Sequence, residues 1–257
     1  ATEDVSRLTS SELFKKVRDI PGLEIGIDIG GTDGKVTIMD GEHEEPIFMK
    51  EYVWELKPTN MTDGKMYADS VVKLIDFSLA VVNLNKASGH EELKAAAKQL
   101  YDKDVNPDAE KAPLEELVAF TAKVKEVLSD LEAPLSFGMA FPDVTMNNRI
   151  VGGVNTKTKA LRARFQESDK ENWRTAYRAH FNATVSRLAQ TVSEELQRIY
   201  GVDQPIPTGV VNDGNVGALW AAVVSSKESS LSELRTASSV KQVHAKHKSM
   251  DYLRSIG

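Results

Sequence analysis

A short alternating segment and the glycine-rich turn that follows it, residues 24–36, constrain the fold of this chain more than any other stretch. Isoleucine occupies every second position of residues 25–29, and this period of two predicts a β-strand with one apolar face. Asp28 lies between two of these isoleucines and is therefore expected on the opposite, polar face. The sequence thus predicts a carboxylate close to the end of a half-buried strand.

The turn after this strand contains Gly30, Gly31 and Gly34, which supply the positive-φ positions of a tight connection. The apolar alternation restarts at Val36, so the turn is expected to join two strands of a hairpin. Such a turn presents backbone N–H groups that converge on a phosphate, and Asp28 beside it would be placed to hold Mg²⁺ through water. An ordinary glycine-rich hairpin explains the same residues. Further motifs in the chain are therefore needed to distinguish a phosphate-binding turn from an ordinary hairpin.

Composition sets the class of protein. The chain has 257 residues, of which 41% are hydrophobic and 27% charged, as in an ordinary globular protein of one large or two small domains. The net charge of −6 argues against nucleic acid as the main partner. Cysteine is absent, which excludes disulfides and thiolate zinc sites. No apolar run approaches the ~20 residues needed to cross a bilayer, and residues 1–16 have no signal-peptide pattern, so we expect a cytoplasmic location without a membrane partner.

Hydrophobic periodicity and breaker residues divide the rest of the chain into elements. Residues 86–132 are charged and rich in alanine, and we interpret them as a solvated helical insertion without chemistry. The domains are then an N-terminal helix over residues 1–23, a lobe over 24–224 and a helical tail over 225–257. The expected elements are a helix near 10–17, strands at 24–29, 36–38 and 46–56, a helix at 67–82, a strand at 134–141, a hairpin strand at 150–155, helices within 168–200 that end at Gly201, a strand at 209–211 and a helix at 214–224.

Three motifs follow one another in the chain. They are Gly-Ile-Asp-Ile-Gly-Gly-Thr at residues 26–32, Gly-Met-Ala-Phe-Pro at 138–142 and Val-Val-Asn-Asp-Gly-Asn-Val-Gly-Ala-Leu at 210–219. Together they resemble the phosphate, sugar and Asn-Asp motifs of sugar kinases in the ROK and hexokinase group, which belong to the actin-like ATPase superfamily. The order β-β-β-α-β-α-β-α also matches their ribonuclease-H-like lobe. The resemblance covers the core of residues 24–224 and implies an α/β fold with a mixed sheet flanked by helices, plus helical insertions.

The resemblance also implies a reaction, the transfer of a phosphoryl group from ATP with Mg²⁺ to a hydroxyl of a hexose-type sugar. This reaction needs an electrostatic cradle for the phosphates and a base on the attacking hydroxyl, and the resemblance implies Asp213 as that base. Asp213 as N-cap of a helix beginning at Gly214 explains the same residue, and the two roles are compatible. The further implied roles are Mg²⁺ orientation through water for Asp28, phosphate binding for Gly30, Gly31, Thr32 and Lys35, and sugar binding for Asn155, Asn212 and Asp213.

The chain departs from the family pattern in several places. Many ROK members have lysine where this chain has Asp33, and a carboxylate beside a phosphate is unfavourable unless Lys35 offsets it. Thr156 and Lys157 depart from the Pro-Asn-Leu segment that Asn155 otherwise resembles. The ROK zinc-binding cysteine cluster is missing, and the five histidines have no metal-ligand spacing.

Actin-like kinases have a second lobe after the Asn-Asp helix, with a further glycine-rich phosphate turn. Residues 225–257 contain no such turn, so we expect the chain to represent a kinase that lacks most of its second lobe. A non-catalytic module that binds sugar, or that serves in regulation or interaction, is the alternative. The identity of the sugar and the oligomeric state, including a homo-oligomer, stay open.

Overall fold

The computed structural model describes residues 22–30, 33–40, 46–53, 62–105, 114–152 and 158–212. The helices expected near residues 10–17 and at 214–224, and the tail at 225–257, lie outside these residues. In chain order the elements are β1 (Leu23–Ile29), β2 (Asp33–Asp40), β3 (Phe48–Val53), α2 (Lys65–Lys86), α3 (Glu91–Val105), α4 (Leu114–Val127), β4 (Pro134–Phe141), β5 (Thr145–Met146), β6 (Arg149–Ile150), α5 (Lys159–Ser168), α6 (Trp173–Ala183), the 3₁₀ helix η2 (Val185–Arg187), α7 (Leu188–Tyr200) and β7 (Thr208–Asn212).

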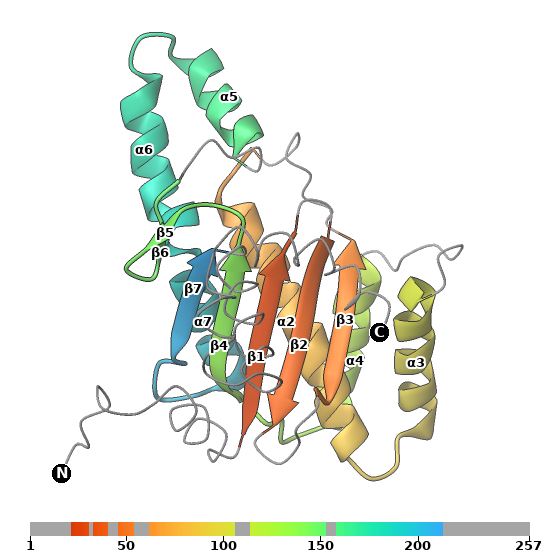
Figure 1. Cartoon of the computed structure of the whole chain (residues 1–257). Coiled ribbons are helices and arrows are strands. Elements are labelled where there is room, and N and C mark those ends of the chain that lie inside the picture. The colour runs from red at the N-terminus through yellow and green to blue at the C-terminus, as the bar shows by residue number, and fades with distance from the viewer. Residues whose placement is uncertain are drawn as a thin grey trace, which may run out of the picture.

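The strands form a mixed sheet in the order β3-β2-β1-β4-β7, with helices packed on it (Figure 1). β1 pairs antiparallel with β2, and β2 with β3, whereas β1 pairs parallel with β4, and β4 with β7. The central strand β1 therefore separates an antiparallel half of the sheet from a parallel half. The expected mixed α/β architecture is confirmed at this level.

The alternation of residues 25–29 has the predicted effect. Ile25, Ile27 and Ile29 are buried under the helices, and Gly26 between them is exposed. β4 has the predicted bounds, lies between β1 and β7, and is buried on one face. Phe137, Met139 and Phe141 point into the core, and the intervening glycine is exposed. The two central strands thus share one buried and one open face.

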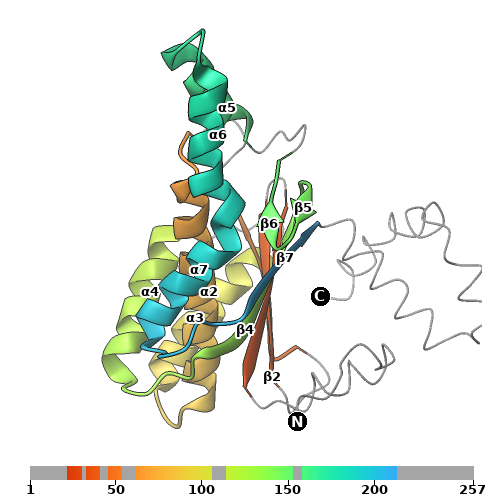
Figure 2. The ribbon, with the colours of Figure 1, turned by 90° about the vertical axis from the view of Figure 1, so that its left-hand side faces the viewer.

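Helix α2 lies at the centre of the helical layer, on one side of the sheet (Figure 2). It contacts β2, β3, α4 and α7, and most of its side chains are buried. Tyr67 near its start packs edge-on against Phe141, and Phe77 packs in the same way against Tyr52. Aromatic contacts therefore anchor both halves of α2 to the sheet.

The segment at residues 86–132 is helical, as expected, but only partly solvated. Helix α4 buries Leu117, Phe120 and Val124, and it packs along α2. The interpretation of the whole segment as a solvated insertion was therefore wrong for α4, which belongs to the core layer. Helix α3 is attached more locally, because the buried Lys50 of β3 donates hydrogen bonds to two carbonyl oxygens near its carboxyl end.

The helical pattern of residues 168–200 is divided into α6, η2 and α7, and α5 precedes it as a separate helix. Helices α5 and α6 form an antiparallel pair that projects beyond the sheet at the edge where β1, β4 and β7 end (Figure 1). Helix α7 returns along the sheet and contacts both β4 and β7. Gly201 ends α7 in the left-handed conformation, with φ of 64°, as the sequence predicted.

A small hairpin, β5–β6, covers the outer edge of the sheet. Of the hairpin strand expected at residues 150–155, only Ile150 lies in a strand, because β6 ends there after pairing with β5. Residues 151 and 152 are not in a strand, and residues 153–155 lie outside the described residues. Asn147 and Asn148 form the turn of the hairpin with positive φ angles. The Asn148 side chain donates to Thr208 O and accepts from Val210 N, so it occupies the free edge of β7 as a neighbouring strand would.

Candidate functional site

The carboxyl ends of the parallel strands bring two candidate residues to one side of the sheet. We call this side, which is formed by the strand ends, the candidate edge. Asp28 of β1 is in register with Ala140 of β4, and the next residue of β4, Phe141, is in register with Asn212 of β7. Asp28 and Asn212 therefore lie at the same edge, with one strand between them. Figure 1 shows the three strands, β1, β4 and β7, side by side. The candidate edge is the edge beyond which α5 and α6 project.

The two residues occupy different faces of the sheet. Asp28 alternates with buried isoleucines, so it belongs to the open face. Asn212 is in register with Phe141, whose side chain is buried in the helical layer, so Asn212 belongs to the covered face. A ligand that contacts both residues has to lie across the edge of the sheet rather than upon either face.

The turn after β1 joins β1 and β2 as predicted. The Gly30 N–H donates a hydrogen bond to Asp33 O at 2.8 Å. A Cβ atom at position 30 would collide with the Asp33 carboxylate, so a side chain there would displace the carboxylate from its present position. The Gly30 N–H is therefore engaged within the hairpin and is not directed at a phosphate. Gly31 and Thr32, the other candidate residues of this turn, lie outside the described residues.

Lys35 lies on the open face directly opposite Asp28, because the two residues are register partners on antiparallel strands. Its ammonium is 3.9 Å from the carboxylate of Glu51 on β3. A row of alternating charge thus crosses three strands close to the candidate edge. The arrangement places a cation beside Asp28, where the sequence alone left the direction of the lysine open.

The amide of Asn212 is held in one orientation. Its Nδ2 donates to the main-chain oxygen of Asp143 at 2.9 Å. Its Oδ1 has no hydrogen-bond partner among residues 22–30, 33–40, 46–53, 62–105, 114–152 and 158–212. Asn212 therefore presents a carbonyl acceptor that suits the hydroxyl of a ligand. Asp213 follows it directly, and both Asp213 and Asn155 lie outside the described residues.

Asp143 is a site residue that the motif comparison missed. It follows the end of β4 and is 7% exposed, which is unusual for a carboxylate. Its Oδ1 accepts from the Val144 N–H, whereas Oδ2 is buried without a partner in the described part of the chain. The signal in the sequence was an acidic residue two positions after the last residue of an apolar strand. Burial, together with this carboxylate, raises the pKa of the Tyr67 phenol well above its ordinary range.

The carboxylates that the structure describes at the site are too few to hold a metal on their own. Within the described ranges, no group of three or more His, Cys, Asp or Glu side chains could hold a metal ion. Mg²⁺ is often bound by one or two carboxylates together with water and substrate phosphates. The position of Asp28 at the strand end fits a Mg²⁺ ion that arrives with a nucleotide.

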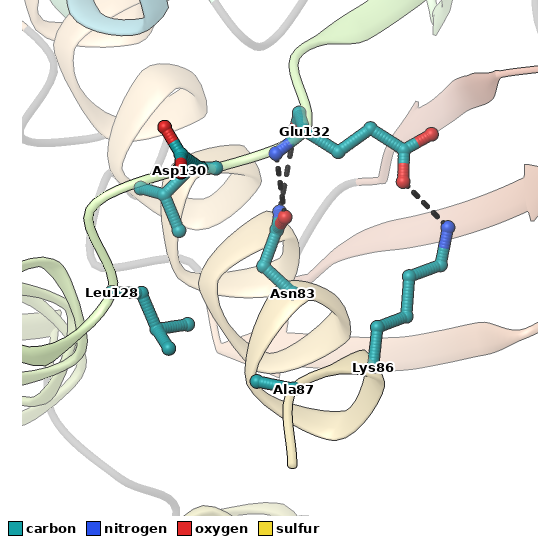
Figure 3. A pocket seen from close by; sticks show the side chains of 7 residues that line it. Asn83, Lys86, Ala87, Leu128, Asp130 and Glu132 are labelled. Atoms are coloured by element: carbon teal, nitrogen blue, oxygen red, sulfur yellow. Dashed lines mark hydrogen bonds and ion pairs between the residues drawn. The ribbon is translucent and has the colours of Figure 1, made fainter.

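Two surface cavities lie on the helical layer. One, of about 570 Å³, lies between α2 and α7. The other, of about 460 Å³, lies at the opposite end of α2, beside the loop that leads into β4 (Figure 3). There Asn83 bonds both main-chain groups of Glu132, and Lys86 pairs with its carboxylate. All of these groups satisfy one another, so the second cavity marks a structural clamp.

Comparison with known proteins assigns no family. No protein-family model matches the chain, and the search of curated proteins gives no match. Of the helices that the structure describes, none is long and apolar enough to span a bilayer.

Proposed function

We propose that the chain is built on the ribonuclease-H-like lobe of the actin-like ATPase superfamily and serves as a sugar kinase of the ROK and hexokinase group. The observation that carries this proposal is the edge of the sheet where Asp28 and Asn212 both lie, one on each face, with Asp213 next in the chain. The strand order β3-β2-β1-β4-β7, with its antiparallel and parallel halves, supports the fold assignment. The cytoplasmic location expected from the sequence belongs to the same proposal.

In the proposed reaction a hexose hydroxyl oxygen attacks the γ-phosphorus of ATP. The new O–P bond forms as the bond from phosphorus to the bridging oxygen of ADP breaks, and the hydroxyl proton passes to the Asp213 carboxylate. Asn212 Oδ1 accepts a hydrogen bond from a second sugar hydroxyl. Asp28 orients the water molecules of Mg²⁺, and the metal offsets the negative charge of the phosphates.

Fewer residues are available to bind phosphate than the motif implied. The Gly30 N–H is engaged by Asp33, so the candidates that remain are Gly31, Thr32 and the ammonium of Lys35. Lys35 lies beside Asp28 and close to Glu51, so two carboxylates already offset its charge. The phosphates would therefore depend strongly on Mg²⁺ for charge compensation.

The test is sugar-dependent formation of ADP in a coupled assay, on a protein that contains both lobes of the proposed kinase. Asp213→Asn should lower turnover by about 10²–10⁴-fold, because it removes the general base. Asparagine keeps an oxygen that can cap a helix, so the thermal stability should hardly change. Asp203→Asn is the matched control, because Asp203 is exposed on the loop before β7. Equal turnover in Asp213→Asn and the parent would remove Asp213 from the mechanism.

A non-catalytic sugar-binding or regulatory module is the second candidate. Asp33 favours it, because this residue places a carboxylate at the phosphate turn and its main-chain oxygen occupies the Gly30 N–H. Calorimetry with a panel of hexoses and with MgATP separates the two functions. A kinase binds both ligands, whereas sugar binding without nucleotide binding would support the module.

A further inference from the structure

The projecting pair of helices α5 and α6 meets the chain just before α2, at residues 62–64. The Arg164 guanidinium of α5 donates a hydrogen bond to Thr62 O at 2.9 Å. Thr184, directly after α6, packs so closely on Gly64 that a Cβ atom there would collide with the threonine side chain. We call this contact between the helix pair and residues 62–64 the joint, and Figure 1 shows the pair projecting beyond it.

His180, in the last turn of α6, lies within the joint. Its Nε2 accepts a hydrogen bond from the Gly64 N–H at 3.3 Å, and the same atom lies 3.3 Å from Asp63 Oδ1. Phe165 of α5 packs against the imidazole, with 5.3 Å between the two ring centroids. The His180 side chain is 24% exposed, so water can exchange protons with the ring. One ring atom thus lies equally close to a donor and to an acceptor.

The proton on the ring decides which of these two partners it bonds. A ring nitrogen accepts a hydrogen bond only while it carries no proton, so the bond from Gly64 requires a neutral ring with its proton on Nδ1. When the ring gains a second proton, Nε2 becomes a donor. It then has to release the Gly64 N–H and can donate to the Asp63 carboxylate instead. Both partners are already within reach, so the exchange needs little movement of α6.

The charged groups around the ring come from three elements. Asp63 precedes α2, and its Oδ1 also accepts from the Lys65 N–H at 3.0 Å. Lys65 is the first residue of α2, and Arg164 of α5 is bound to Thr62 O. Among the residues that the structure describes, only Asp63 places a carboxylate within 4 Å of the His180 ring. Asp63 is therefore the partner that a protonated ring would take.

We propose that His180 is a proton-operated switch in the joint. With a neutral ring, Nε2 holds the Gly64 N–H and ties α6 to the residue that precedes α2. With a protonated ring, the bond passes to Asp63 and the Gly64 N–H loses its partner. Histidine serves widely as the pH switch of proteins. Arg164 and Thr184 keep the pair attached in both states, so protonation loosens the start of α2 without releasing the pair.

The switch does not depend on phosphoryl transfer, so its test reads out protonation rather than activity. In NMR spectra of the isotope-labelled chain, long-range proton–nitrogen correlations should place the proton of the neutral His180 ring on Nδ1. As the ring is protonated, the Gly64 amide signal should move with the same midpoint. Hydrogen exchange of this amide, corrected for the direct effect of pH, should become about fivefold faster, as expected for the loss of one ordinary hydrogen bond.

Three variants separate the switch from a general effect of acid. His180→Gln identifies the ring signals, and its amide oxygen can accept from Gly64 at every pH, so the Gly64 signal should no longer titrate. His90→Gln is the matched control, because His90 is exposed before α3, and it should leave the Gly64 titration unchanged. Asp63→Asn should lower the pH at which the Gly64 signal moves, because the protonated ring loses its charged partner.

Two results in the folded parent protein would overturn the proposal. One is a neutral His180 ring with its proton on Nε2, because such a ring cannot accept from Gly64. The other is a Gly64 amide that does not follow the titration of the ring. Both measurements use the unchanged chain, so they decide the proposal even if circular dichroism shows that a variant does not fold.

Discussion

Asp28 and Lys35 face each other as register partners across β1 and β2, on the open face of the sheet. Glu51 continues the row on β3, 3.9 Å from the Lys35 ammonium. The Lys35 and Glu51 side chains are 28% and 41% exposed, so water screens their pairing and its contribution to stability is small. The row matters more as a charge pattern at the candidate edge, where one cation stands between two carboxylates.

Asp28→Asn tests the role of this carboxylate. The substitution should weaken MgATP binding by about 10–100-fold, because a neutral amide orients the water molecules of the metal less well. Binding of ATP without Mg²⁺ should stay the same or improve, since one negative charge is removed. Calorimetric titrations with and without Mg²⁺ measure both values.

Glu24→Gln is the matched control for this experiment. Glu24 lies on the same strand and the same face, near the opposite edge of the sheet. It should leave MgATP affinity unchanged. Equal losses in Glu24→Gln and Asp28→Asn, or an equal loss without Mg²⁺, would contradict a metal-orienting role for Asp28.

Gly30→Ala should destabilise the first hairpin by about 1–3 kcal/mol, because the added Cβ collides with the Asp33 side chain. The same substitution should cost less in an Asp33→Gly background, where the carboxylate is gone. Urea denaturation of the four proteins gives the coupling energy between the two positions. Additive effects would show that the Asp33 side chain does not set the requirement for glycine.

Asn83→Ala should lower the free energy of unfolding by about 1–3 kcal/mol, because both main-chain groups of Glu132 lose their buried partner. Lys86→Ala, on the same turn of α2, removes only an exposed ion pair and should cost about 0–1 kcal/mol. Urea denaturation compares the two variants (Figure 3). The clamp interpretation fails if Lys86→Ala is the more damaging substitution.

Acid should loosen the start of α6. The main-chain N–H groups of Asn172 and Glu171 donate to Asp169 Oδ1 and hold the pKa of that carboxyl below its ordinary value of 3.8. A lowered folded-state pKa means that the stabilisation is present above the ordinary value and is lost as pH falls through the folded-state pKa. Carbon-detected NMR should give a titration midpoint below 3.8 for Asp169.

Asp169→Asn is the companion variant, because it keeps an acceptor oxygen without a titrating proton. The amide shifts of Glu171 and Asn172 should follow the acid titration in the parent protein and stay constant in the variant. Identical pH profiles in the two proteins would assign the acid response to another group.

The local hydrophobic pattern predicted much of the fold, because the periodicity of a strand or a helix depends only on residues that are close in the sequence. The bounds of β4 and the end of α7 at Gly201 followed from apolar runs and glycine. The break between α6 and α7 did not, because the apolar stripe of Phe181 and Val185 continues through it. The break coincides with a contact to another part of the chain. Thr184 packs so closely on Gly64, which precedes α2, that a Cβ atom at position 64 would not fit.

The candidate site was predictable in part. Motif order indicated Asp28 and Asn212, and the pairing of the strands brings both to one edge. The direction of Lys35 required the register of the first hairpin. The burial of Asp143 and its bond to the Asn212 amide depend on pairing between β4 and β7, which no local pattern encodes.

The place of β1 in the sheet also sets an order for assembly. One edge of β1 pairs with β2, the next strand in the chain. The other edge pairs with β4, which begins only at Pro134 and is therefore synthesised much later. During synthesis the first hairpin can close early, since its contacts are local, whereas the parallel pairing has to close a long loop. Until then β1 exposes a row of unpaired backbone N–H and C=O groups that can pair with another chain. Helices α2 and α4 are made in this interval, so they are available to pack on the first hairpin before the sheet is complete.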